Sequence, residues 1–170
     1  MMETVKIARA TKNDADGVLK ISKTAFLQYQ NELHSNYKLP ALFETKEEVE
    51  LDIEKNSVLI AKENGEIIGS IRYKKLTEKL AYVYRFAVDP EEQNGGVGTA
   101  LIEFVIEECE KKGFSVVALH TNTKYFTLAR YYYGKQFFVH STTCDRGYIR
   151  ALFVKELNAG EYDLSPAMSL

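Results

Sequence analysis

The middle of the chain constrains the fold most, because strand and helix patterns alternate there around a glycine-rich loop. Residues 80–88 are rich in strand formers and stop at Asp89-Pro90, where proline cannot donate to a sheet ladder. Residues 97–109 repeat apolar side chains at helical spacing, and residues 114–120 form a second, largely apolar run. A strand, a helix and a buried strand in this order predict a parallel crossover, the unit of α/β folds.

The rest of the chain adds strands and helices on both sides of this unit. Capping boxes, in which Thr is followed three residues later by an acid, occur at residues 11–14 and 45–48 and predict two helix starts. Glu63-Asn64-Gly65 separates two β-rich runs and favours a hairpin turn. We therefore expect an α/β fold with a mixed sheet of about seven strands and helices on both faces. The predicted strands are 5–10, 57–62, 66–73, 80–88, 114–120, 137–144 and 148–155, and the predicted helices are 15–29, 45–55, 97–111 and 125–133, the last stopped by Gly134.

Length and composition fit one globular domain. With 170 residues and 45% hydrophobic content, the chain is long enough to bury a sizeable core but too short for two ordinary domains. We expect one domain over residues 1–157. Residues 158–170 lack periodicity, so we expect a C-terminal tail that is loose or docks on a partner.

Charge and cysteine content exclude several classes of partner. Lys and Arg total 22 against 24 Asp and Glu, and this net charge of -2 gives no attraction to nucleic acid or to an anionic membrane. No apolar run reaches the roughly 18 residues of a membrane helix, and the N-terminus lacks a secretion signal, so we expect a cytoplasmic protein. Cys109 and Cys144 have no partner at metal-ligand spacing, which predicts reduced thiols and no metal site.

Residues 93–98, Gln-Asn-Gly-Gly-Val-Gly, have the composition and position of an anion site. The first N–H groups of a helix lack helical acceptors, the helix dipole is positive there, and glycines let the backbone approach a phosphate. A flexible turn with an ordinary helix cap is the alternative. No Gly-Lys-Ser/Thr follows, which excludes a P-loop. A dinucleotide site is the weaker candidate, because the loop is long and residues 120–122, His-Thr-Asn, offer no acid to a ribose.

Phe86-Ala87-Val88-Asp89-Pro90 followed by residues 93–98 resembles the acetyl-CoA signature of the GNAT (Gcn5-related N-acetyltransferase) superfamily, whose loop reads Q/R-x-x-G-x-G/A. The order of predicted elements is similar to that family across almost the whole chain. The resemblance implies a GNAT-like mixed, splayed sheet and acetyl-CoA as co-substrate. It implies that the backbone of Phe86 and Val88 pairs with the pantetheine arm and that amides of residues 94–99 hold the pyrophosphate. The implied cofactor-binding residues are Phe86, Ala87, Val88, Gln93, Asn94, Gly95, Gly96, Val97, Gly98 and Thr99.

The resemblance also implies a general acid for the departing thiolate. In the family, a tyrosine in an A-x-x-F-Y-x-x-x-G-F frame often lies near the sulfur, and Tyr133 takes that position here. Packing in the core is the alternative for Tyr133. Two positions depart from the frame, since Phe126 stands where the family often has Asn and Phe137 replaces the usual Gly. His120 is the candidate base, directly or through water, and a structural histidine is its alternative.

The sequence gives fewer indications of the residues that bind the acceptor amine. Glu32 and His34 follow the first predicted helix, where the family often shapes its acceptor cleft, and Tyr29 and Tyr84 are candidates to line a partly aromatic pocket. We expect an N-acetyltransferase, an acyltransferase in which a primary amine of a small molecule, protein or peptide attacks acetyl-CoA directly in a ternary complex. A non-catalytic acyl-CoA-binding regulatory module is the alternative, because no carboxylate base is evident. A homodimer is the assembly to test.

Overall fold

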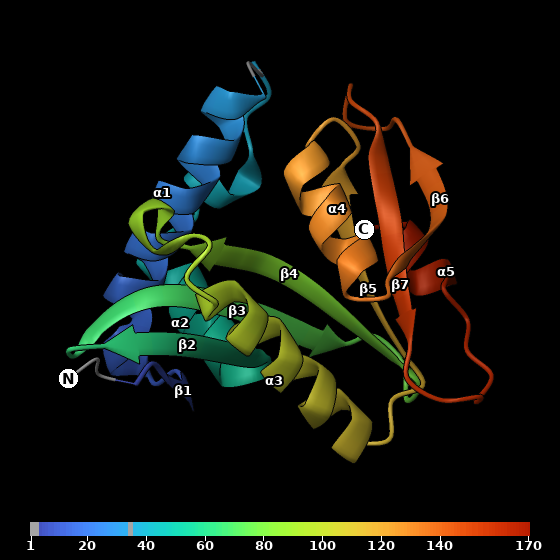
Figure 1. Ribbon diagram of the computed structural model, residues 1–170, viewed down its shortest axis with the longest axis horizontal. Helices are drawn as coiled ribbons and strands as arrows, with labels where there is room; N and C mark the ends of the chain where they lie inside the picture. The colour runs from blue at the N-terminus through green and yellow to red at the C-terminus, as the bar shows by residue number, and fades with distance from the viewer. Residues whose placement is uncertain (1–3, 34–35) are drawn as a thin grey trace. The chain divides into compact units, whose positions relative to one another are not determined.

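The computed structural model describes residues 4–33 and 36–170, and its strands form one seven-stranded mixed sheet (Figure 1). The strand order is β1-β2-β3-β4-β5-β7-β6. The chain folds into two compact units, the first containing the described residues up to Tyr73 together with Arg85–Val105. The second contains Lys74–Tyr84 and Ile106–Leu170. The α/β class and the strand number predicted from the sequence are confirmed.

Three antiparallel strands form the sheet portion of the first unit. They are β1 (Lys6–Arg9), β2 (Ser57–Glu63) and β3 (Glu66–Lys75). The β2–β3 turn contains Asn64 at φ 50° and Gly65 at φ 79°, the left-handed pair that a tight hairpin requires. The predicted hairpin is therefore confirmed. The next strand, β4 (Leu80–Val88), begins in the second unit and ends in the first.

Both predicted capping boxes are present at the helices of the first unit. Before α1 (Ala15–Glu32), the Thr11 N–H donates to the Asp14 carboxylate at 2.8 Å. At α2 (Lys46–Lys55), the Thr45 N–H donates to Glu48 at 2.8 Å, and the Glu48 N–H donates back to the Thr45 hydroxyl at 3.2 Å. Each box supplies acceptors to N–H groups that the helix itself leaves without partners.

Helices cover both faces of the β2–β3 hairpin within the first unit (Figure 1). Val58 and Ile60 of β2 pack with buried side chains of α1 and α2, which lie behind the strands in the figure. On the opposite face, a Cβ atom added at Gly69 would lie 2.9 Å from Leu101 and 3.0 Å from Val97 of α3 (Val97–Lys111). Glycine at this position therefore lets α3 lie close to β3.

The second unit contains the remaining strands. In β4, Leu80–Tyr82 pair in parallel with Val116–Ala118 of β5 (Val116–Asn122). β5 pairs in antiparallel fashion with β7 (Arg150–Glu156), which also pairs with β6 (Phe138–Thr143). One hydrophobic cluster of this unit contains the buried residues Leu80, Tyr82, Val116, Ala118, Leu152, Val154, Leu164 and Ala167.

α3 ends in a Schellman motif after Lys111, the predicted end of this helix. Gly113 has φ 83°, its N–H donates to the Glu110 carbonyl oxygen at 3.0 Å, and the Phe114 N–H donates to that of Cys109 at 3.1 Å. Phe114 thus belongs to the turn that closes the helix. For this reason β5 begins at Val116, two residues later than predicted.

The next helix ends at Gly134, close to its predicted end, but the expectation that a glycine provides the stop is wrong. α4 (Phe126–Gly134) includes Gly134, and the left-handed residue that ends it is Gln136 at φ 65°. The N–H groups of Gln136 and Phe137 donate to the carbonyl oxygens of Tyr133 and Tyr132, each at 3.0 Å. The bonds are those of a Schellman motif with glutamine in the place that glycine usually takes.

The expectation of a loose or partner-bound C-terminal tail is also wrong. A short helix, α5 (Ser165–Met168), follows residue 164, and both Leu164 and Ala167 are buried in the core of the second unit. The Leu170 carbonyl oxygen accepts hydrogen bonds from Arg146 and Arg150, each at 3.0 Å. Two apolar side chains in one helical turn are too few to give a periodic signal. The division of the chain into a domain and a tail at residue 157 stays a prediction.

Both cysteines are free thiols, as predicted. Cys109 is buried in α3, where burial raises the pKa of its thiol to about 12, and Cys144 is exposed after β6. Within residues 4–33 and 36–170, no group of His, Cys, Asp and Glu side chains has the geometry to hold a metal ion. None of the helices in this described part is long and apolar enough to cross a membrane.

Candidate functional site

The predicted anion site consists of the end of β4, the 3₁₀ turn η3 (Pro90–Glu92) and the first turn of α3, all within the first unit. The Asp89 N–H donates to the Ile68 carbonyl oxygen, and the Asp89 carboxylate accepts from the Glu91 N–H, both at 2.9 Å. Asn94 at φ 69° and Gly96 at φ 89° then turn the chain into α3. The loop is therefore anchored at its start and turned by two left-handed residues.

The N-terminus of α3 presents backbone donors beside a close strand. The first helical hydrogen bond of α3 runs from the Ala100 N–H to the Gly96 carbonyl oxygen at 2.9 Å. An α-helix supplies no acceptor to its first N–H groups, so the start of α3 has the backbone geometry that binds anions. A Cβ added at Gly98 would lie 3.3 Å from the Phe86 ring and 3.4 Å from Val88. Glycine thus allows the helix start to lie against β4.

Gln93 holds the loop against α1. Its side-chain amide nitrogen donates to Gln28 at 2.9 Å and to the Val88 carbonyl oxygen at 3.4 Å. The side chain is therefore part of the scaffold of the loop. Its predicted contact with the cofactor, like the predicted contacts of Phe86, Ala87, Val88, Asn94, Gly95, Gly96, Val97, Gly98 and Thr99, stays a prediction.

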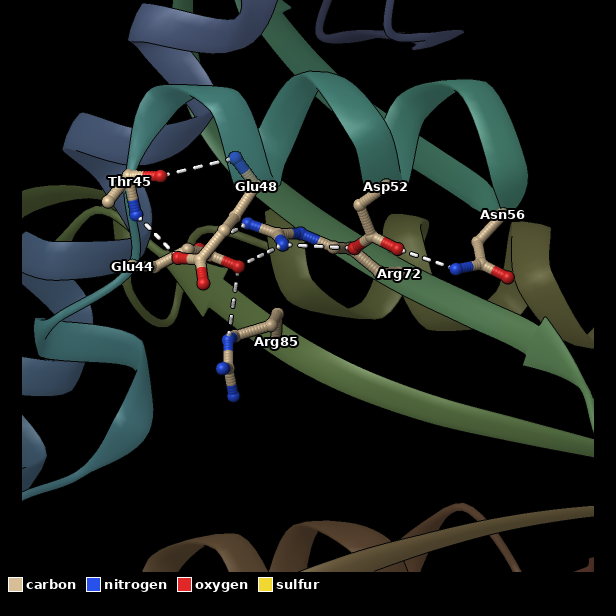
Figure 2. Close-up of polar contacts among 7 residues, drawn as sticks. All are labelled: Glu44, Thr45, Glu48, Asp52, Asn56, Arg72 and Arg85. Atoms are coloured by element: carbon tan, nitrogen blue, oxygen red, sulfur yellow. Dashed lines mark hydrogen bonds and ion pairs between the residues drawn. The ribbon is translucent and has the colours of Figure 1, made fainter.

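A buried charge cluster lies on the α2 side of β3 in the same unit (Figure 2). Arg72 of β3 is 1% exposed, and its two terminal nitrogens donate to the two Glu44 carboxylate oxygens at 2.7 and 2.9 Å. One of them also donates to Asp52 of α2 at 3.0 Å. Arg85 of β4 approaches Glu44 from the other side, with 3.7 Å between its Nε and the carboxylate. A bidentate pair of this kind ties the segment before α2 to the sheet.

A pocket of about 330 Å³ opens beside this cluster. Sequence reasoning missed both the cluster and the pocket, although one signal was available. Arg72 interrupts a strand whose neighbouring positions are mostly apolar, and a charge buried in a sheet needs a partner of opposite charge. The residues that line the pocket are Pro40, Phe43, Glu44, Glu48 and Arg85.

His120, the predicted base, pairs with a buried tyrosine in the second unit. Its Nδ1 and the Tyr82 hydroxyl oxygen are 2.7 Å apart and share a hydrogen bond. Burial, assisted by the positive charges of Arg150 and Arg146, lowers the pKa of His120 to about 4. The imidazole is therefore neutral at neutral pH and has a ring nitrogen that can accept a proton. The sequence indicated His120 but not its partner, which lies 38 residues away.

Tyr133, the predicted acid, has an exposed side chain. It is 57% exposed, and its ring packs edge-on against Phe153 with 5.5 Å between the ring centroids. Tyr132 is the core aromatic of this helix, being 3% exposed and packed against Phe137. Phe126, where the family often has Asn, is 73% exposed at the start of α4. The role of Tyr133 as acid stays a prediction.

The predicted acceptor residues are divided between the units. Tyr29 and Glu32 belong to α1 in the first unit, where burial and the nearby Glu32 charge raise the pKa of Tyr29 to about 12. Tyr84 belongs to the second unit, and the Lys74 ammonium lies 5.3 Å from the centroid of its ring. His34 lies outside the described residues. The acceptor roles of these residues stay predictions.

Solved structures of several acetyltransferases resemble this fold. The PaiA N-acetyltransferase of Thermoplasma acidophilum, in complex with coenzyme A, has a TM-score of 0.79 at 17% identity, covering 91% of this chain and 99% of that one. The putative acetyltransferase yncA of Salmonella typhimurium, with acetyl-CoA, has a TM-score of 0.77 at 17% identity, covering 95% and 98%. The ribosomal-protein-S18-alanine N-acetyltransferase of Escherichia coli has a TM-score of 0.74 at 17% identity, covering 95% and 99%.

Sequence comparison gives a more specific result than these structural likenesses. No curated protein sequence matches the chain. A family model does match, however, over residues 24–137, which include the strand, the loop and the helix start described above. That model is the one for the acetyltransferase (GNAT) family, and its match covers more than half of the chain. The chain therefore belongs to the acetyltransferase (GNAT) family.

Proposed function

We propose that this protein is an N-acetyltransferase that passes the acetyl group of acetyl-CoA to a primary amine by direct attack in a ternary complex. The observation that carries the proposal is the glycine-rich turn from β4 into α3, which leads into a helix N-terminus, the backbone arrangement that favours an anion. Family membership supports acyl transfer. Relatives of this fold that were solved with coenzyme A and acetyl-CoA support the choice of co-substrate.

The first unit holds the co-substrate in this proposal. The pyrophosphate accepts hydrogen bonds from backbone amides of residues 94–99, and the backbone of Phe86 and Val88 pairs with the amide-bearing pantetheine arm. The absence of a side chain at Gly98 favours this arrangement, because the helix start then lies against β4, the strand that pairs with the pantetheine arm in this proposal. Acetyl-CoA supplies the activated acyl group when it is bound.

Two side chains of the second unit handle protons in this proposal. His120 accepts the proton of the attacking amine at a ring nitrogen. Its pKa of about 4 keeps the imidazole in the neutral form at neutral pH, although it also makes the group a weak base. Tyr82 fixes the ring through the hydrogen bond to Nδ1. Tyr133 donates its hydroxyl proton to the departing thiolate, a role that its exposed side chain permits.

Two measurements test the proposal. In a thermal shift assay, acetyl-CoA should raise the melting temperature and NAD should not, because a ligand stabilises only the fold that binds it. Release of free coenzyme A thiol should then appear with at least one amine in a broad screen of small amines and peptides. Acetyl-CoA binding without thiol release from any amine would instead identify a non-catalytic acyl-CoA-binding module.

The acid is tested by replacing Tyr133 with Phe, which removes only the hydroxyl. General acid catalysis contributes on the order of 10²-fold or more, so Tyr133→Phe should lower kcat by about that factor and leave acetyl-CoA affinity unchanged. The matched control is Tyr131→Phe on the same helix, which should retain full turnover. Unchanged kcat in Tyr133→Phe would remove Tyr133 from the mechanism.

A further inference from the structure

The pocket beside Arg85 contains a guanidinium whose hydrogen-bonding capacity is largely unused. The Arg85 Nε is buried and makes no hydrogen bond within the described residues, since its 3.7 Å contact with Glu44 is an ion pair only. Figure 2 shows the Nε facing Glu44 and the two terminal nitrogens pointing away from the cluster. Arg85 is therefore oriented by Glu44, while no side chain or backbone group among the described residues accepts from its terminal donors.

Arg72 explains why Glu44 does not pair more closely with Arg85. Both Glu44 carboxylate oxygens already accept hydrogen bonds of 2.7 and 2.9 Å from Arg72, which is itself 1% exposed. This charge-assisted bidentate pair is stronger than the 3.7 Å contact between Glu44 and Arg85. Arg72 therefore fixes the position of the Glu44 side chain at the edge of the pocket. The other acid of the pocket, Glu48, accepts the Thr45 N–H in the capping box of α2.

The backbone of Arg85 is a second, independent sign of a functional position. Arg85 has φ 51°, a left-handed conformation that is uncommon for a residue other than glycine and is unfavourable within a strand. Strained residues of this kind concentrate at ligand sites. Arg85 also immediately precedes Phe86, the first residue of the segment that the proposed function assigns to the pantetheine arm.

We propose that the pocket of Pro40, Phe43, Glu44, Glu48 and Arg85 binds a carboxylate of the acceptor, so that the acceptor is a small amine that also carries a carboxylate. The inference rests on the proposed acetyl transfer and names its substrate class. The planar fork of Arg85 matches a carboxylate and forms two parallel hydrogen bonds with it. Pro40 and Phe43 provide apolar contact for the short carbon chain between the two charged groups, and about 330 Å³ accommodates a molecule of amino-acid size.

The test compares amines that differ only in the carboxylate. The pairs are L-alanine and ethylamine, 4-aminobutyrate and propylamine, and L-phenylalanine and phenethylamine, each assayed by thiol release from acetyl-CoA. The carboxylate member of at least one pair should have the higher kcat/KM. Arg85→Gln should lower that value roughly 10- to 100-fold, the range for a lost charge-assisted bidentate contact, and should leave the value for the plain amine unchanged.

Two variants make the result specific. Arg85→Lys keeps the positive charge but cannot form two parallel hydrogen bonds with a carboxylate. Its kcat/KM for the carboxylate amine should therefore lie between the values for wild type and Arg85→Gln. Arg9→Gln, the same change at an exposed arginine of β1, should change nothing. An equal loss of kcat/KM for both members of a pair in Arg85→Gln would overturn the inference. A preference for a polyamine such as spermidine, abolished by Glu48→Gln, would also overturn it.

A binding measurement separates failure of this inference from failure of the proposed function. 3-Phenylpropionate carries a carboxylate but no amine, and its binding is measured by NMR titration of the full chain. If no amine releases thiol but 3-phenylpropionate binds wild type and not Arg85→Gln, the carboxylate site stands and the acetyl transfer fails. If thiol is released but 3-phenylpropionate binds both proteins equally or neither, the carboxylate site fails.

Discussion

Among the described residues each unit buries one arginine in a strand, and the charges of the two arginines are compensated very differently. Arg72 in the first unit is 1% exposed and donates to two carboxylates at 2.7 to 3.0 Å. Arg150 in the second unit is 4% exposed, yet its carboxylate partner Asp145 is 55% exposed and lies 3.3 Å away. One charge is thus neutralised by short, buried contacts, and the other is not.

The difference shows what an incompletely neutralised buried charge does to its neighbours. Arg72 is paired with Glu44 and Asp52, and these ion pairs hold the segment before α2 against β3. Arg150 donates to the Leu170 main-chain oxygen and to the carboxylate of the partly hydrated Asp145, and its remaining field is a cause, after burial, of the low pKa of His120. The first arginine is therefore a structural element, whereas the second adjusts the chemistry of a candidate catalytic group.

The largest effect is expected from breaking the first pair. Arg72→Met leaves Glu44 and Asp52 buried without their cation, and removal of one partner of a buried ion pair costs about 3–5 kcal/mol. The free energy of unfolding from urea denaturation measures this loss. Arg150→Met is the matched change in the other unit and should cost less, because the acid that it leaves behind is half hydrated. Equal losses would mean that the two arginines do not differ in the way described.

The next effect is a dependence of stability on pH that arises from His120. Its pKa is about 4 in the folded protein against an ordinary 6.5, so between these values the unfolded chain binds more protons. The stabilisation is complete above pH 6.5 and is lost as the pH falls toward 4. Urea denaturation at pH 7 and pH 5 should show that His120→Gln removes roughly 1–2 kcal/mol of this decline after allowance for solvent screening. An identical decline in the variant would contradict the low pKa.

The smallest effect concerns the field of Arg150 itself. Arg150→Gln should raise the pKa of His120 from about 4 toward 6.5, because one of the two positive charges that act on it is removed. Arg150→Lys keeps the charge and should keep the pKa low. NMR titration of the imidazole C–H signal follows both variants directly. A pKa that stays near 4 in Arg150→Gln would show that Arg150 does not contribute and would leave burial and Arg146 as the causes.

Features that depend on neighbours in sequence were predictable. The capping boxes at Thr11 and Thr45, the Asn64-Gly65 turn and the Gly113 stop each have their partners within five residues, so local patterns identify them. The loop between β4 and α3 was predictable for the same reason. At Gln136 a local rule failed, because a glutamine adopts the left-handed conformation that glycine usually provides.

Features that depend on distant residues were not predictable. Arg72 and Glu44 lie 28 positions apart, and Tyr82 and His120 lie 38 apart, so only the folded chain shows that they pair. The burial of Leu164 and Ala167 likewise depends on a surface that β5 and β7 provide. Reasoning from the sequence therefore identified the loop between β4 and α3 and individual candidate residues, but not the pocket or the groups that set the pKa of His120.

The contrast between the two thiols has a practical consequence for every assay that follows released coenzyme A with a thiol reagent. Cys144 is exposed and will react at once, whereas Cys109 is buried with its pKa raised to about 12 and will react only when α3 opens. The background is therefore one rapid equivalent per chain, which can be blocked beforehand. After that step, the slow labelling of Cys109 reports the opening frequency of α3 in the unmodified sequence, with and without acetyl-CoA.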